Sequence, residues 1–237
     1  TTMCGRYPDG EGLPHSSAVL HGRLGLPEAC ASFDISLGCS GYVYGLSIVS
    51  SFMHANGCAC GLLFTADPYS KIIDPDDRDT VLLFGDGASV SLLKAGADRS
   101  GWRPTRFKYM TRGADRAALC VVNGHLSMKG RQVFNFSATA VPPLVNALLK
   151  EAGLGTEDID QFLFHQGSKY IVDALRQRLK LPAEKVPLKL YEQGNTVSTS
   201  IPLMLEMAIA NPDARRLLLS GFGVGLSAAV CLLERQS

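Results

Sequence analysis

The sequence has almost no excess charge, no long apolar run and no cluster of basic residues. Its 23 basic and 22 acidic residues leave a formal net charge of +1. A protein that binds nucleic acid through the phosphates is usually more basic. The apolar stretches are much shorter than the roughly 20 residues that cross a bilayer, and no secretory signal pattern opens the chain. These absences argue against a nucleic-acid partner and a membrane span, and they predict a cytoplasmic protein.

Cysteines at metal-binding or disulfide spacing are also missing. The seven cysteines are scattered, and the only close pair is Cys58 and Cys60. These positions provide neither a disulfide framework nor a C-x-x-C metal site, so we expect free thiols and no bound metal. Aromatic residues are few, at 8%, but 46% of the 237 residues are hydrophobic. That fraction excludes a disordered chain and suffices for a large core.

Short apolar segments alternate with amphipathic segments along the chain. Helical periodicity predicts helices over residues 15–24, 42–55, 134–152, 168–180 and 198–210, the third interrupted at Pro142-Pro143. Apolar runs predict strands over residues 31–35, 58–65, 80–84, 88–93, 161–164, 186–190, 216–220 and 225–233, whereas residues 1–12 are expected to form a loop. The alternation predicts a layered α/β fold with a mixed or largely parallel sheet.

Cys39 follows the predicted strand 31–35 and stands among small residues at the start of a predicted helix. The helix dipole and free backbone N–H groups at such a position would lower the pKa of the thiol and favour the thiolate. Gly38 and Gly41 would let a substrate carbonyl approach the backbone. An inert buried cysteine is the competing interpretation, and position alone does not separate the two.

His165 directly follows the predicted strand 161–164, and Asn195 lies between a predicted strand and a predicted helix. Ligands bind at the carboxyl ends of the strands in parallel sheets. Taken singly, such a histidine is more often structural, and such an asparagine is more often a turn or helix-cap residue. A cysteine, a histidine and an asparagine at three strand-to-helix junctions together indicate acyl chemistry on a cysteine nucleophile.

Five segments resemble one enzyme family in their order and spacing. They are 34–47 (DISLGCSGYVYGLS), 84–88 (FGDGA), His165-Gln166, 194–202 (GNTVSTSIP) and 221–225 (GFGVG). Together they resemble the β-ketoacyl-acyl-carrier-protein (ACP) synthases III over essentially the whole chain. The resemblance implies an α/β thiolase-like fold, with two similar layered halves and a homodimeric assembly. It divides the chain into residues 1–115, an N-terminal half that lacks its opening portion, and residues 116–237.

The resemblance also implies an activity. Members of this family transfer an acyl group from acyl-CoA to the cysteine and condense it with malonyl-ACP, releasing CO2 and forming a 3-oxoacyl product. By this resemblance Cys39 is the nucleophile, and His165 and Asn195 stabilise the enolate formed from the malonyl thioester. The backbone N–H groups of Cys39 and Val224 would form a second oxyanion hole. Acyl-CoA and ACP are the implied partners, and no cofactor is implied.

Further residues are assigned to the substrates by their place in the family's pattern. Leu13, Arg78 and Phe222 are implied to bind acyl-CoA, with Leu13 replacing an aromatic residue that reaches into the partner's acyl tunnel and Arg78 packing on the adenine. The resemblance makes three basic residues candidate contacts for the acidic carrier protein: Lys169, Arg176 and Arg178. A solvated helix face is the competing interpretation of these three residues. Val224 stands where the family usually has glycine, and valine tolerates a positive φ poorly.

Two other functions stay open. One is an acyltransferase on the same fold that delivers the acyl group to a hydroxyl or amine without decarboxylation, and the other is a non-catalytic partner subunit. Asn195 favours condensation, because simple transfer has less need of an enolate-binding group. No G-x-S-x-G motif supports a hydrolase, and segment 221–225 lacks the third glycine of a dinucleotide-binding motif.

Overall fold

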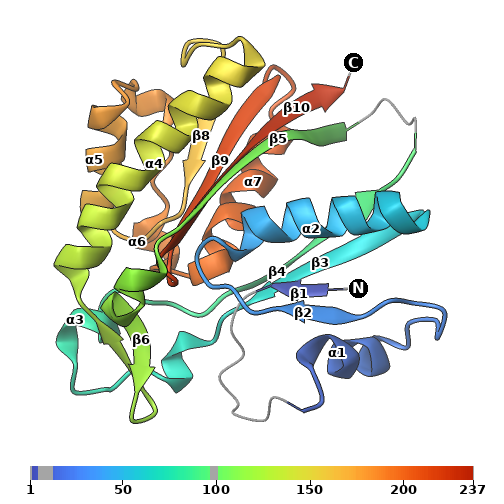
Figure 1. Ribbon diagram of the computed structural model, residues 1–237, viewed down its shortest axis with the longest axis horizontal. Helices are drawn as coiled ribbons and strands as arrows, with labels where there is room; N and C mark the ends of the chain where they lie inside the picture. Colours follow the sequence, from blue (N-terminus) through green and yellow to red (C-terminus); the bar gives the residue numbers. More distant parts are fainter. Residues whose placement is uncertain (1, 5–12, 97–100, 237) are drawn as a thin grey trace.

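A computed structural model describes residues 2–4, 13–96 and 101–236, which form two four-stranded sheets with helices between and outside them (Figure 1). The first sheet has the order β2-β1-β3-β4, with β1 (Thr2–Cys4), β2 (Phe33–Ile35), β3 (Cys60–Ala66) and β4 (Ala88–Lys94). Strand β1 is parallel to both neighbours, and β4 is antiparallel to β3 at the edge of the sheet.

The second sheet has the order β5-β10-β9-β8 and is mostly antiparallel. Its strands are β5 (Gly101–Thr111), β8 (Gln161–Phe164), β9 (Arg216–Gly223) and β10 (Ser227–Gln236). Only β8 and β9 are parallel in this sheet. A separate hairpin consists of β6 (Leu119–Val122) and β7 (His125–Met128).

Helices and sheets alternate in layers. The helices are α1 (Ser16–Leu24), α2 (Gly41–Asn56), α3 (Arg78–Val81), α4 (Gly130–Ala152), α5 (Lys169–Arg178), α6 (Leu190–Gln193) and α7 (Ser200–Ala210). Helices α2 and α7 lie between the two sheets, whereas α4 and α5 cover the outer face of the second sheet and α1 contacts the first (Figure 1). The predicted layered α/β fold is confirmed.

The central helix α2 is apolar over most of its surface because it packs on both sheets. Tyr42, Leu46 and Val49 are buried in one core with side chains of β3, β9 and β10, and an all-round apolar sequence is typical of such an interior helix. Gly57 ends the helix in the left-handed conformation, at φ 64°. The N-terminal end of α2 directly follows Cys39 and Ser40.

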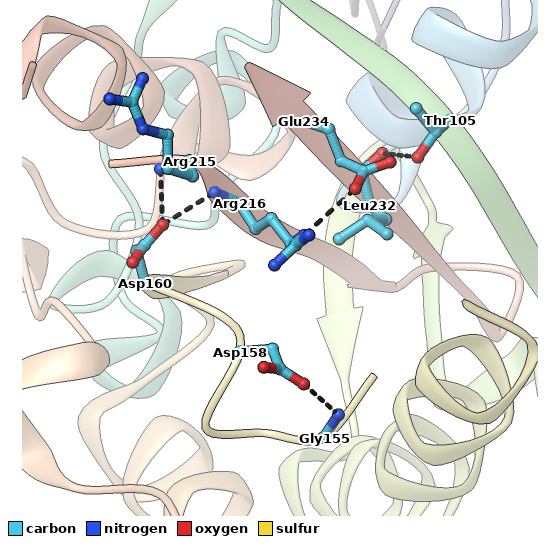
Figure 2. Close-up of polar contacts among 8 residues, drawn as sticks. All are labelled: Thr105, Gly155, Asp158, Asp160, Arg215, Arg216, Leu232 and Glu234. Atoms are coloured by element: carbon cyan, nitrogen blue, oxygen red, sulfur yellow. Dashed lines mark hydrogen bonds and ion pairs between the residues drawn. The ribbon is translucent and has the colours of Figure 1, made fainter. Parts of the chain in front are cut away.

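The start of β8 is fixed to the start of β9 by a carboxylate (Figure 2). Asp160 accepts hydrogen bonds from the backbone N–H groups of Arg215 at 2.6 Å and Arg216 at 2.7 Å. The Arg216 side chain donates in turn to Glu234 on the neighbouring strand β10, at 3.1 Å. Because β8 is a short strand of 4 residues, fixing its first end also determines where His165 emerges from its other end.

Two predicted strands are wrong. The segment 80–84 lies in α3 and the turn after it, where the Asp77 carboxylate caps the helix and accepts hydrogen bonds from the Asp79 N–H at 3.1 Å and the Thr80 hydroxyl at 2.9 Å. The segment 186–190 connects a 3₁₀ turn to α6. Its Pro187 has no N–H to contribute to a strand ladder.

The predicted interruption at Pro142-Pro143 is also wrong, because α4 continues through both prolines. Val141, Leu144 and Val145 are buried in the core formed with the second sheet. The two prolines cost the helix two backbone hydrogen bonds. The burial of its apolar face outweighs that loss.

The sequence did not predict β1, β5 or the β6–β7 hairpin. Residues 2–4 form β1, so the expected loop is wrong there, and residues 5–12 lie outside the described residues. Strand β5 pairs with β10 in the second sheet, although the predicted boundary between residues 115 and 116 would assign it to the first half. The boundary between residues 115 and 116 stays a prediction.

Candidate active site

Cys39 lies between β2 and the start of α2, and its side chain is only 3% exposed. Strand β9 passes directly against it at a glycine. A Cβ atom on Gly221 would lie 2.6 Å from the Cys39 carbonyl oxygen and 2.7 Å from Cα of Ser40. Only glycine permits this approach of two backbones, and the approach holds the nucleophile segment against the second sheet.

The Cys39 thiol is not a thiolate in this unloaded site, contrary to the expectation from its helix position. Burial raises its pKa to about 12, with a smaller contribution from the Asp67 carboxylate. Hydrogen bonds from the backbone N–H groups of Val224 and of Cys39 itself act in the opposite direction and lower the pKa. Desolvation of a buried anion therefore outweighs the helix and backbone dipoles.

His165 lies at the carboxyl end of β8 and is 2% exposed. Its Nδ1 is 2.7 Å from the hydroxyl oxygen of Ser200, and its ring meets Phe222 edge-on with the centroids 5.4 Å apart. Burial lowers the pKa of His165 to about 3, although the neighbouring Val197 carbonyl partly opposes this shift. The imidazole is therefore neutral at physiological pH and can donate through one nitrogen only.

Asn195 is held by its backbone and by both ends of its side-chain amide. It forms an isolated parallel bridge with Phe84. Its Oδ1 accepts a hydrogen bond from the Val197 N–H at 3.0 Å, and its Nδ2 donates to the Gly167 carbonyl at 3.4 Å. These contacts fix the orientation of the amide and leave its second N–H available.

Cys39, His165 and Asn195 line one pocket of about 160 Å³. Most of the other lining side chains are apolar. They come from the loop after α3, the β6–β7 hairpin, the start of α4, the segment around α5 and the end of β9: Leu83, Phe84, Leu119, Met128, Gly130, Val133, Phe134, Gly167, Ser168, Tyr170, Ile171, Phe222 and Gly223. A neutral histidine and an asparagine thus face a buried thiol in surroundings of low polarity.

The other residues implied by the family resemblance lie at different distances from this pocket. Phe222 lines it, whereas Leu13 and Arg78 are exposed and do not. Val224 directs its N–H at the Cys39 sulfur. Its own φ is not positive, although its neighbours Gly223 and Gly225 have φ of 155° and 133°, so valine brings no left-handed strain here.

The three basic candidates all lie on α5, whose first turn borders the pocket through Tyr170 and Ile171. They are Lys169, Arg176 and Arg178. Lys169 forms an ion pair with Asp173 one turn along the helix, and Arg176 lies 3.9 Å from the same carboxylate.

Three features of the site are not predicted by the sequence patterns. Ser200 lies in the segment 194–202, where no pattern assigns it a role. Leu119 and Met128 come from a hairpin that the sequence did not predict. Asp67, buried directly after β3, binds the backbone N–H of Ser198 at 3.1 Å and raises the pKa of Cys39. An acidic residue directly after an apolar strand was the available signal for Asp67.

Within residues 2–4, 13–96 and 101–236, no helix has both the length and the hydropathy for a membrane crossing. The same ranges hold no group of three or more His, Cys, Asp or Glu side chains placed to bind a metal ion.

Two family models match the chain. The model described as 3-oxoacyl-[acyl-carrier-protein (ACP)] synthase III, a synonym of β-ketoacyl-ACP synthase III, matches residues 33–113. The model described as the C-terminal part of the same enzyme matches residues 149–235.

Individual proteins agree with these matches. The chain is 37% identical over 219 residues to β-ketoacyl-ACP synthase III 2 of Streptomyces coelicolor, covering 90% of this chain and 66% of that protein. It is 31% identical over 239 residues to the synthase III of Lactococcus lactis, covering 94% and 73%. The crystal structure of the synthase III from Pseudomonas aeruginosa PAO1 superposes with a TM-score of 0.90 at 32% identity, covering 100% of this chain and 76% of that structure.

The fold and these similarities define a thiolase-fold acyltransferase of the condensing type. The chain belongs to the 3-oxoacyl-ACP synthase III family, as its sequence motifs predicted. It spans 66% and 73% of the length of the two curated relatives.

Proposed function

We propose that this chain transfers an acyl group from acyl-CoA to Cys39 and condenses it with malonyl-ACP. The observation that carries the proposal is that Cys39, His165 and Asn195 line the same largely apolar pocket. A nucleophile beside two neutral hydrogen-bond donors is what this pair of reactions requires. Family membership supports the same chemistry.

In the first proposed step, the sulfur of Cys39 attacks the thioester carbonyl of acyl-CoA. The bond between that carbonyl carbon and the CoA sulfur breaks, and CoA leaves with the proton of the thiol. The N–H groups of Cys39 and Val224 flank the sulfur, so they are placed to stabilise the oxyanion that forms at the carbonyl.

In the second proposed step, malonyl-ACP loses CO2 and becomes an enolate. Its oxygen accepts hydrogen bonds from His165 and Asn195, and its carbon attacks the acyl carbonyl on Cys39. The bond to sulfur breaks, and the Cys39 thiolate that leaves takes a proton from solvent. The two thioesters supply every atom of the product, so the chemistry calls for no cofactor. Both thioesters are intracellular metabolites, and a cytoplasmic location fits the free thiols of Cys30, Cys39, Cys58, Cys60, Cys120 and Cys231.

The test is the intact mass of the protein after mixing with a series of acyl-CoAs, and again after adding malonyl-ACP. We expect an acyl adduct that malonyl-ACP removes with release of CO2. An adduct that malonyl-ACP leaves in place would identify an acyltransferase with another acceptor. The absence of any adduct would favour a non-catalytic partner subunit. Phe222 and Arg78 are proposed to contact acyl-CoA. The acyl-CoA that gives the most adduct would show which acyl chain length the site prefers.

We propose that α5 binds the carrier protein, because its basic residues lie on the helix that borders the pocket. Arg178→Glu is expected to raise the KM for malonyl-ACP about three- to ten-fold and the KM for acyl-CoA much less, since charges at the rim of an interface mainly affect association. Steady-state kinetics at low salt measures this. Arg23→Glu, on the exposed part of α1, is the matched control. Equal effects of the two variants would contradict the assignment.

We propose that two copies of the chain pair through β4. This strand is at the edge of the first sheet, and Val90 and Leu92 point outward from it at 55% and 58% exposure. Exposed apolar side chains on an edge strand favour pairing with another strand, and a two-fold axis brings identical edges together. Leu13, at 87% exposure, is then proposed to contact the second subunit, in keeping with its place in the family's pattern.

The mass in solution tests this assembly. The wild-type protein is expected at twice its 25.4 kDa in light scattering after gel filtration, and Leu92→Lys is expected at the monomer mass. Val121→Lys places the same charge on an exposed position of the β6–β7 hairpin and is expected to stay dimeric. A wild-type monomer, or a dimeric Leu92→Lys protein, would rule out this interface.

A further inference from the structure

A buried hydroxyl and a backbone carbonyl are the neighbours of the His165 ring that influence its proton. The hydroxyl oxygen of Ser200 lies 2.7 Å from Nδ1, and the Val197 carbonyl is the second partner of the ring. The opposite edge of the ring is beside Gly167 at the pocket, where a Cβ atom on that glycine would be 3.4 Å from Cδ2 and 3.5 Å from Nε2. Nε2 is therefore the nitrogen that faces the substrate.

A neutral imidazole carries one N–H, and the partner of one nitrogen determines which nitrogen holds the proton. For Nε2 to donate to an oxygen in the pocket, Nδ1 must accept a hydrogen bond. The Val197 carbonyl cannot supply one, because a carbonyl has no proton. Ser200 can, since its hydroxyl is both a donor and an acceptor.

The remaining contacts of Ser200 are compatible with this direction of donation. Its oxygen accepts a hydrogen bond from the Gln166 N–H at 3.3 Å, which leaves its proton to be directed to one of two acceptors. One is Nδ1 of His165, and the other is the Val197 carbonyl at 3.0 Å. That carbonyl already accepts from the backbone N–H of Ser200, so donation to Nδ1 leaves neither acceptor unpaired.

We infer that Ser200 is a positioning residue that holds His165 in the tautomer protonated on Nε2. Without the hydroxyl, none of the described side chains donates a hydrogen bond to Nδ1. The Val197 carbonyl, 3.0 Å from the Ser200 oxygen, then favours a proton on Nδ1. Nε2 then presents a lone pair to the pocket, which repels an enolate oxygen. The catalytic consequence rests on the proposed function, in which His165 donates to that oxygen, whereas the tautomer itself does not.

The experiment compares the wild-type and Ser200→Ala proteins, each labelled with ¹⁵N-histidine. The His165 signals are assigned by their loss in His165→Ala. NMR is expected to show Nε2 protonated in the wild-type protein and Nδ1 protonated in the variant. Condensation is expected to fall about 10²-fold or more, as for the loss of one oxyanion donor, while acylation by acyl-CoA is retained. Ser200→Thr keeps a hydroxyl and is expected to restore the Nε2 tautomer and most of the condensation.

The control is Thr199→Ala, which removes a neighbouring buried hydroxyl that bonds to Thr65 and Gly87 instead of the histidine. It is expected to leave the tautomer and condensation unchanged. An unchanged tautomer in Ser200→Ala would overturn the inference. If the tautomer changes in Ser200→Ala but the wild-type protein does not condense malonyl-ACP, the inference about Ser200 stands and the proposed function is rejected. The two failures are therefore distinguishable.

Discussion

A Cys39→Ala protein is expected to gain no mass from acyl-CoA, under conditions in which the wild-type protein gains one acyl group. Cys39 is the cysteine among the residues that line the pocket. Among the described residues that line the pocket, two others carry a hydroxyl group, Ser168 and Tyr170. The Ser168 oxygen accepts the Ile171 N–H at 3.2 Å and caps α5, and Tyr170 is 71% exposed. Loss of the thiol therefore removes the acyl acceptor altogether, and the expected loss of adduct is complete rather than partial.

Intact mass spectrometry followed by peptide mapping measures this loss. Cys231→Ala is the matched control, because Cys231 is also fully buried but lies in the core between the sheets, away from the pocket. Burial raises the pKa of both thiols, so a difference between the two variants reports on location and not on thiol acidity. An adduct on another cysteine in the Cys39→Ala protein would refute the assignment of the nucleophile.

The five longer helices of this fold, α1, α2, α4, α5 and α7, could be predicted from local sequence signals, and so could several strands. Gly25 and Gly57 end α1 and α2 in the left-handed conformation, and a glycine at that position is readable without tertiary information. The false strand at residues 80–84 shows the limit. Its aliphatic run favours a strand, but a side-chain cap from Asp77 starts a short helix inside it.

Strand β5 shows a second limit. Its sequence interleaves Arg103, Arg106 and Lys108 with aromatic residues, which does not look like a core strand. It forms because β10 offers a long apolar neighbour, from Ser227 to Gln236. A strand whose stability comes from its partner cannot be inferred from its own composition, because β propensity depends on the neighbours.

The polar centre of the site was easier to predict than its walls. Cys39, His165 and Asn195 follow strands or precede helices, and such junctions are visible in the sequence. The walls are built by the β6–β7 hairpin and by the start of α4. No local sequence pattern predicts that these two segments lie side by side. The predicted direction of the Cys39 pKa shift was wrong for the same reason, because the shift is set by burial and burial depends on the whole fold.

Replacing either His165 or Asn195 with alanine is expected to spare acylation and to reduce condensation about 10²- to 10³-fold. In the proposed mechanism, acylation uses the N–H groups of Cys39 and Val224, which lie at the Cys39 sulfur and which neither change removes. Condensation creates a negative charge on the malonyl thioester oxygen in largely apolar surroundings. There each hydrogen bond to the anion is stronger than in water, so each lost donor is costly.

The protonation state of the histidine makes the prediction specific. Burial lowers the pKa of His165 to about 3, so the imidazole is neutral from pH 5 to pH 8. The expected loss of condensation in His165→Ala is therefore the same across this range. The Asn195 amide is neutral as well, and its orientation is fixed by the Val197 N–H. Two neutral donors suit an oxygen that gains charge during the reaction. A permanent positive charge would also stabilise the malonyl carboxylate, which must leave as CO2.

Single-turnover kinetics with acylated protein and malonyl-ACP measures the condensation step by itself. The double variant His165→Ala/Asn195→Ala is expected to be little slower than either single variant, since groups that act on one oxygen are strongly non-additive. Asn211→Ala, at the exposed end of α7, is the control for a general loss of stability. Wild-type condensation rates in both single variants would exclude the enolate-binding role, while leaving the assignment of Cys39 intact.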